Sequence, residues 1–236
     1  VATSIGGVGI PLLTENYVKG DFRAAGKLVQ DNLTMLVAFL LPATIGAVAI
    51  AEPLYTVFYG KPDSLALGLF ILAMLQTVIL GLYTVLSPMI QALFQNRKAI
   101  LYFGYGVLVK LILQVPFIYV FKAYGPLLST TIGLMIPIVL MYKEIHLVTH
   151  FNRKNVFKRS LLTAILTLIM LLVVLVAGFI LGLVIKPNGR VTSMIYVALI
   201  GGVGIVVYGG LGLRLRFLDR FIGSKAASLR NKFHIS

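Results

Sequence analysis

One lysine lies in the middle of a long apolar stretch and has the clearest capacity for chemistry in the chain. The stretch runs from Ala99 to Phe121 and reads AILYFGYGVLVKLILQVPFIYVF, with Lys110 near its centre. Because about 20 residues of helix span the hydrocarbon of a bilayer, the stretch is long enough to cross one. An ammonium at that depth costs roughly 2.5–3.5 kcal/mol on insertion scales, and such charges usually serve a function. Lys110 is therefore a candidate ligand for an anion.

The residues around Lys110 form a polar face on the predicted helix. Steps of four residues place Tyr102, Gly106, Lys110 and Gln114 on one side. All seven carboxylates of the chain lie at or near the ends of apolar stretches, and none matches the depth of Lys110. The partner of the ammonium is then a polar side chain, a residue outside this sequence, or an anionic ligand. We favour the ligand. A structural lysine held by polar groups, or one kept neutral by desolvation, stays open as an alternative.

A second polar stripe lies on the preceding apolar stretch. Gln76, Thr84, Ser87 and Gln91 fall on one side of the predicted helix, and Gln76 lies deepest in the apolar part. Together with prolines inside several stretches, which remove helix hydrogen bonds, such stripes favour a transporter over a passive anchor. Gln76 is therefore a further candidate for a substrate path.

The residue patterns give little indication of a metal site, a cofactor site or a catalytic centre. His146 and His150 are four apart, but no third ligand is evident, so a pair at headgroup level fits better than a metal site. The chain has no cysteine, which excludes disulfides and thiolate ligands. No nucleophile–base pair, carboxylate dyad or phosphate loop appears, so we predict neither an enzyme nor a bound cofactor.

The composition identifies an integral membrane protein. Of 236 residues, 59% are hydrophobic and only 12% are charged, against about 25% charged in soluble domains. The chain begins inside an apolar segment, Val1 to Tyr17, which we expect to be the end of a span in a longer protein. Six complete spans are predicted, at about residues 33–51, 65–86 with a continuation past Pro88 to 94, 99–121, 127–142, 161–185 and 191–213.

The net charge of +14 comes from the connections between spans, which argues against nucleic acid and gives an orientation. Alternate connections fall on alternate sides of a membrane. One side carries sixteen cations: Lys19, Arg23, Lys27, Arg97, Lys98, Lys143, Arg153, Lys154, Lys158, Arg159, Arg214, Arg216, Arg220, Lys225, Arg230 and Lys232. The other side carries four: Lys61, Lys122, Lys186 and Arg190. By the positive-inside rule, we expect the C-terminus in the cytoplasm.

The character of the spans changes after Tyr142. The last two spans contain no charge and are nearly pure aliphatic residues with glycines. Gly178 and Gly182 form a GxxxG step, and Gly204 lies in a glycine-rich last span; close helix packing explains these glycines without a ligand. We divide the chain into residues 1–147 as part of a transporter lobe, 148–213 as a basic connection with two lipid-facing helices, and 214–236 as a basic cytoplasmic tail, an interfacial helix or a solvated end.

Several blocks of sequence resemble the C-terminal half of the multidrug/oligosaccharidyl-lipid/polysaccharide exporter superfamily, and most of all its MurJ-like lipid II flippases. The blocks are ATSIGGVGIPLLTENYVKGD, AEPLYTVFYG, QALFQNRKA and KLILQVPFIYVFKAYGPLLSTTIG, in that order across residues 2–133. The last hundred residues match mainly in having two further spans and a basic end.

The resemblance implies the C-terminal part of a fourteen-helix, two-lobe transporter of the bacterial plasma membrane, with alternating access to a central cavity. It implies a flippase for an undecaprenyl-pyrophosphate-linked saccharide, with lipid II as the expected substrate. The other cavity residues of such a flippase are then expected in a missing N-terminal half. Lys110, Gln114, Tyr102 and Gln76 are then the expected substrate path, and Gly182 and Gly204 mark a groove for the prenyl tail. A drug or metabolite antiporter of the same superfamily, or a membrane scaffold without transport, remain alternatives.

Overall fold

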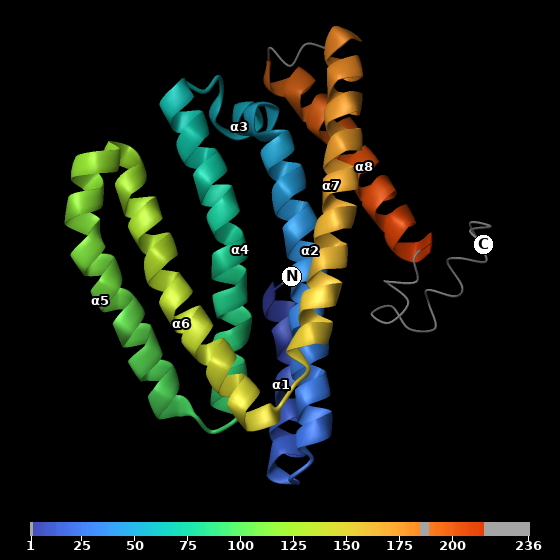
Figure 1. The fold of residues 1–236 in the computed structure, drawn as a ribbon. Coiled ribbons are helices and arrows are strands. Elements are labelled where there is room, and N and C mark those ends of the chain that lie inside the picture. Colours follow the sequence, from blue (N-terminus) through green and yellow to red (C-terminus); the bar gives the residue numbers. More distant parts are fainter. Residues whose placement is uncertain (1, 185–188, 215–236) are drawn as a thin grey trace. The chain divides into compact units, whose positions relative to one another are not determined.

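The computed structural model describes residues 2–184 and 189–214, and every regular element in that part is a helix (Figure 1). In chain order these are α1 (Ala2–Val18), α2 (Phe22–Ala49), α3 (Ala51–Tyr59), α4 (Ser64–Ala92), α5 (Asn96–Phe121), the 3-10 turn η1 (Lys122–Tyr124), α6 (Gly125–Thr149), α7 (Arg153–Val184) and α8 (Arg190–Arg214). Five apolar stretches in the described part are long enough to cross a membrane, and one of them contains both α5 and α6. The predicted all-α membrane fold is confirmed.

The first predicted polar connection is wrong, because most of it is helical. Residues 18–32 were expected to be a loop, whereas α2 begins at Phe22 and runs unbroken to Ala49. Asp21 caps its first turn, with the Ala24 N–H donating to the Asp21 Oδ1 at 2.9 Å. Ala25 and Val29 are fully buried on one side of the new turns. The apolar residues cover only a narrow side of this helix, so the average hydropathy of the segment does not indicate a span. Their spacing of four residues is the pattern that indicates an amphipathic helix.

Two other connections are also more helical than predicted. The stretch 52–64 was expected to be a loop, but most of it forms the short helix α3, which packs against α8. The basic connection 143–160 is reduced to a corner of three residues, because α6 extends to Thr149 and α7 begins at Arg153. Basic residues end an apolar span without ending its helix, since lysine and arginine are good helix formers. The predicted continuation past Pro88 is confirmed within α4.

The chain divides into two compact units. Unit 1 comprises residues 1–40 and 71–160, and unit 2 comprises residues 41–70 and 161–236. The core of unit 1 brings together side chains from α1, α2, α4 and α6 that are at most 1% exposed, among them Leu13, Leu36, Val85, Leu86, Met89, Ile90, Met141 and Ile145. The helices α5 and α6 form a hairpin through η1 and pack along each other.

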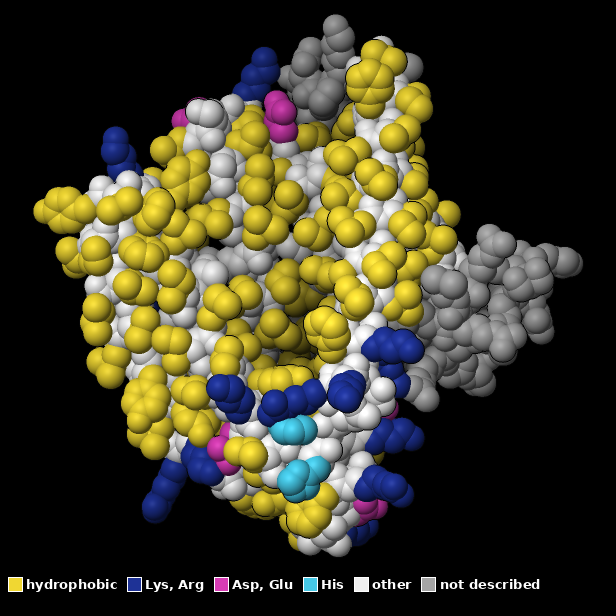
Figure 2. All heavy atoms as spheres, viewed as in Figure 1, with side chains coloured by type: hydrophobic (Ala, Val, Ile, Leu, Met, Phe, Trp, Pro, Cys, Tyr) yellow, Lys and Arg dark blue, Asp and Glu magenta, His cyan; other side chains and the backbone are white. Residues whose placement is uncertain are grey.

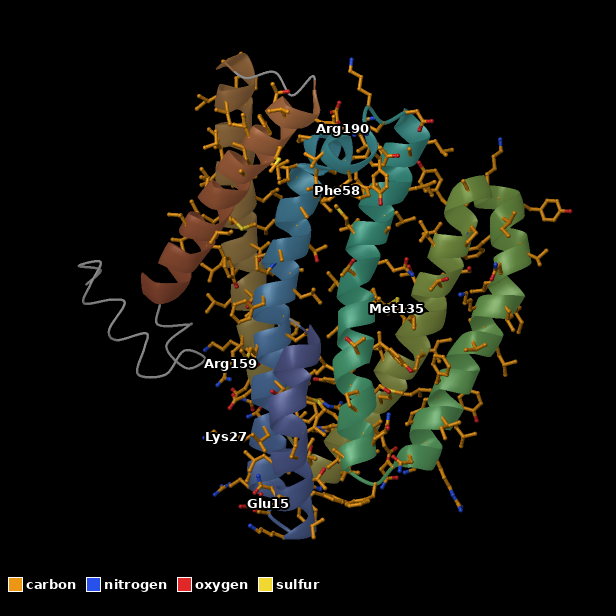
Figure 3. All side chains as sticks on the ribbon, turned by 180° about the vertical axis from the view of Figure 1, so that it is seen from behind. Glu15, Lys27, Phe58, Met135, Arg159 and Arg190 are labelled. Atoms are coloured by element: carbon orange, nitrogen blue, oxygen red, sulfur yellow. The ribbon has the colours of Figure 1, made fainter. Side chains whose placement is uncertain are left out.

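The connections of unit 1 that carry most of its cations meet at one end. The rings of Tyr17, at the end of α1, and Phe94, before α5, are 6.2 Å apart. The Lys98 ammonium, at the start of α5, pairs with the Glu144 carboxylate, near the end of α6, at 2.6 Å. Figure 3 labels Lys27 near this end and Arg159 further along the helices. We call it the cation-rich end; its members are Lys19, Arg23, Lys27, Arg97, Lys98, Lys143, Arg153, Lys154, Lys158 and Arg159. This grouping agrees with the alternation of connections.

Unit 2 is built mainly from α7, α8 and α3. Its buried cluster is Ile50, Met170, Val174 and Ile200. The Tyr196 hydroxyl donates to the Gly178 carbonyl at 2.8 Å, which fixes the spacing of α7 and α8. Much of the remaining surface of both helices is apolar and exposed, as expected of helices that face lipid.

The boundaries between the two compact units fall inside α2, α4 and α7. The predicted domain boundary lies instead at residue 147, near the end of α6. The division into a transporter lobe and two lipid-facing helices stays a prediction about function. The predicted tail, residues 214–236, lies outside the described residues except for Arg214, the last residue of α8.

Candidate functional site

The polar face of α5 packs against α6 at close range. A Cβ added at Gly106 would lie 2.5 Å from the Gly133 carbonyl oxygen, and one added at Gly133 would lie 2.8 Å from both the Gly106 oxygen and the Lys110 Cβ. Only glycine on both helices allows this approach of two backbones. Gly106 and Lys110, two of the four residues predicted to share a face, therefore lie together at the α5–α6 interface.

A pocket opens beside Lys110 at this contact between the two helices. Its volume is about 110 Å³, and it is lined by Phe103, Gly106, Val107 and Lys110 from α5 and by Thr130, Gly133, Leu134 and Pro137 from α6. Sites for drug-sized ligands typically measure about 300–1,000 Å³, so this pocket accepts only part of a large ligand, such as one headgroup. Most of its walls are apolar, and Lys110 is its only charged residue.

Lys110 itself is half-buried and lies far from both ends of its helix. At 1.5 Å per residue it is about 21 Å from Asn96 and about 17 Å from Phe121, further than a lysine side chain extends. Among the described residues, its ammonium has no hydrogen bond or ion pair. The nearby Thr130 hydroxyl donates to the Pro126 carbonyl at 2.7 Å, so its proton is already used. Lys110 therefore contributes a charge beside a pocket whose own walls are almost entirely apolar.

Tyr102 has a protein partner that the sequence did not reveal. Its hydroxyl donates to Glu144 Oε2 at 3.1 Å, while the Lys98 ammonium bonds the other oxygen, Oε1, at 2.6 Å. The Glu144 side chain is only 12% exposed, so both of its oxygens are satisfied in a largely buried position. Sequence reasoning placed Glu144 at a span end and missed it. Its signal was a lone carboxylate among the cations of residues 143–159.

The other predicted substrate residues are only partly brought to this site. Gln114 is half-buried one turn from Lys110 on α5, though it does not line the pocket. Gln76 is half-buried on α4 and also lies outside the pocket lining. The structure therefore joins Lys110 to Gly106 and to the missed residues Thr130 and Gly133, whose small side chains gave no sequence signal beyond helical spacing.

The two glycines predicted for the lipid groove differ in their surroundings. Gly204 is buried against α7, because a Cβ there would lie 3.3 Å from Val174 Cγ2 and 3.9 Å from Met170 Sδ. Gly182 has open space where its Cβ would be. The packing of α7 on α8 thus explains why residue 204 is a glycine. Gly182 has no such contact and borders free space beside α7.

The histidine pair lies at the corner between α6 and α7. The His146 ring packs edge-on against Phe151, with ring centroids 5.1 Å apart, and His150 ends α6. Within the described ranges, no group of three or more His, Cys, Asp or Glu side chains is placed to hold a metal ion.

Comparison with known proteins confirms the resemblance seen in the sequence. No family model matches the chain. The chain is similar to the lipid II flippase MurJ of Bacillus subtilis (strain 168), at 29% identity over 230 residues that cover 95% of this chain and 42% of that protein. It also matches a solved structure of a lipid II flippase MurJ in an inward closed conformation, with a TM-score of 0.64 and 22% identity over 94% of this chain and 43% of the other. The chain thus spans about two fifths of the length of the relatives it matches.

Proposed function

We propose that this chain is the C-terminal part of a flippase that moves lipid II, an undecaprenyl-pyrophosphate-linked saccharide, across the bacterial plasma membrane by alternating access. The observation that carries the proposal is the similarity to a lipid II flippase along 95% of the chain. The five apolar stretches long enough to span a membrane fit this function physically, as does Lys110, a mid-helix cation that has no ion pair among the described residues. A lipid-linked pyrophosphate needs cations along its path and apolar surface for its tail.

Lys110 is the proposed contact for the pyrophosphate. An ammonium among apolar walls attracts an anion more strongly than a solvated lysine does, because water screens the pair less. Gln114, one turn along α5, is the proposed second hydrogen-bond donor, and Gln76 on α4 a further polar position on the path. The Tyr102 hydroxyl is engaged with Glu144, so it reaches a headgroup only when that bond opens.

The prenyl tail is proposed to follow the exposed aliphatic surface of α7 and α8, with Gly182 at its border. Gly204 serves the same surface indirectly, by allowing α8 to approach α7. The cation-rich end and the C-terminus are proposed to face the cytoplasm. The remaining cavity residues, including further cations, are assigned to the N-terminal part of the longer protein. The antiporter and scaffold alternatives are not favoured, because the similarity is to flippases.

A reconstitution experiment tests the function. The full-length protein in liposomes should move fluorescent undecaprenyl-pyrophosphate saccharide to the opposite leaflet, whereas a small cationic drug should not be transported. This chain alone should insert into the membrane and fail to restore growth in flippase-depleted cells, because alternating access needs two bundles that move about a midplane site. Drug transport without lipid transport would support the antiporter instead.

A further inference from the structure

The first two turns of α7 have an inner and an outer side. On the inner side, Val156 is buried, and the Arg159 guanidinium pairs with Asp31 of α2 at 3.0 Å. The outer side exposes three cations and one aromatic ring, namely Arg153, Lys154, Lys158 and Phe157. The ring of Phe157 is 70% exposed, although its neighbours on the inner side are buried.

The corner that carries this outer side is firmly built. Phe151 is 3% exposed and packs edge-on against the Tyr142 ring, with centroids 5.2 Å apart. The Arg153 guanidinium lies 5.6 Å from the centre of the same Tyr142 ring, as in a cation–π contact. A Cβ at Gly26 of α2 would come within 2.7 Å of the Thr149 carbonyl oxygen, so α2 presses directly on the corner. These contacts fix the backbone of the corner and the Arg153 guanidinium, and thereby the place from which the lysine side chains extend.

The charge of this surface is not neutralised by the part of the chain that the structure describes. The two carboxylates near the corner are already paired, Asp31 with Arg159 and Glu144 with Lys98. Lys154 and Lys158 are four residues apart on one helix, so their like charges repel each other unless an anion lies between them. Figure 2 shows the cations and both described histidines gathered where α6 gives way to α7, beside a surface that is mostly apolar.

We propose that Arg153, Lys154, Lys158 and Phe157 form a binding surface for the headgroup of an anionic phospholipid in the adjacent leaflet. The cations contact the phosphate, and the Phe157 ring enters the glycerol and upper acyl region. The exposed ring favours a lipid over a soluble anion as the ligand, because an aromatic side chain does not strengthen the binding of a soluble phosphate. The helix also continues from these residues directly into a stretch of α7 with mean hydropathy 3.1, which places them at headgroup level.

The test uses the whole chain purified in a neutral detergent, with phosphatidylglycerol as the probe and melting temperature and native mass spectrometry as readouts. The variant replaces Arg153, Lys154 and Lys158 with Gln. The matched control replaces Lys61, Lys122 and Arg190 with Gln, which removes the same charge from exposed positions elsewhere. Each cation near a membrane surface contributes about fivefold to anionic lipid binding, so the variant should bind phosphatidylglycerol roughly 100-fold more weakly, and the control as the unchanged chain does.

A second variant separates a lipid from a soluble anion. Phe157→Ala should weaken phosphatidylglycerol binding severalfold and leave the response to inorganic phosphate unchanged. Three results would overturn the proposal: equal phosphatidylglycerol binding by the cation variant and the control, equal binding of phosphatidylcholine and phosphatidylglycerol, or a full response to inorganic phosphate with no effect of Phe157→Ala. Since all four side chains are exposed, the variants should keep the circular dichroism spectrum of the unchanged chain; if the triple variant does not, Lys158→Gln alone serves the same comparison.

Discussion

Replacing Lys110 with methionine separates the charge of this residue from its packing. Methionine keeps an unbranched stem that contacts Gly133 and fills the α5–α6 interface, but it carries no charge. A fully inserted ammonium costs about 2.5–3.5 kcal/mol, and Lys110 is half-buried, so the empty protein should gain about 1–2 kcal/mol of stability. The melting temperature of the full-length variant should therefore hold or rise by a few degrees.

Transport should change in the opposite direction. A hydrogen bond to a charged group contributes about 1.5–3 kcal/mol, so Lys110→Met should lower flipping of the pyrophosphate lipid about 10- to 150-fold. Lys110→Arg should keep partial activity, because the charge remains while its shape and hydration differ. Flipping is measured in proteoliposomes and divided by the amount of folded protein. Lys122→Met is the matched control, because Lys122 is an exposed cation in the turn of the same hairpin.

The reverse pattern would refute this reasoning. If Lys110 is a structural lysine held by groups outside the described residues, Lys110→Met leaves buried acceptors without a donor, at a cost of about 1–3 kcal/mol. A variant that melts at a lower temperature and still flips normally per folded molecule would remove the ligand role.

Two further predictions concern the helix contacts and the orientation. Gly182→Gln should lower flipping more than expression, because the side chain enters free space beside α7, whereas Gly204→Gln should lower both, because it forces α8 away from α7; equal loss in both variants, measured by flipping and membrane yield, would leave only helix packing. In this cysteine-free chain, Ser64→Cys should react with an impermeant maleimide from outside intact cells, and Asn155→Cys only after permeabilisation; the opposite labelling would reverse the assigned orientation.

The membrane fold could be predicted from the sequence because its signal is an average over many residues. A span needs about 20 apolar residues, and the excess of cations at alternate connections needs only a count. The helix termini depend instead on single contacts. The start of α2 depends on the Asp21 cap and the buried Ala25, and a window of average hydropathy does not resolve either. The helix α3 lies against α8, a contact far apart in sequence, so local patterns gave no reason for it.

The candidate site could be predicted only in part, for a related reason. Lys110 stands out because a charge in an apolar stretch is rare. Its pocket is shaped by Gly106 and Gly133, whose meeting depends on how two helices dock. The pairing of Tyr102 with Glu144 spans 42 residues of sequence and gives a predicted substrate residue a partner within the protein. The function of a residue that depends on how two helices align cannot be predicted from the sequence of one helix alone.

The α5–α6 hairpin is held at three levels, and this limits how Lys110 can move. At the cation-rich end Glu144 joins the two helices through Lys98, and at mid-length Gly106 touches Gly133. At the other end η1 closes the hairpin. A movement of Lys110 relative to the other helices therefore carries α6 with it, and the pocket keeps its lining. Under the function proposed above, the surface that faces the pocket from outside the hairpin is what changes, and the Lys110 ammonium meets the lipid phosphate from each side in turn.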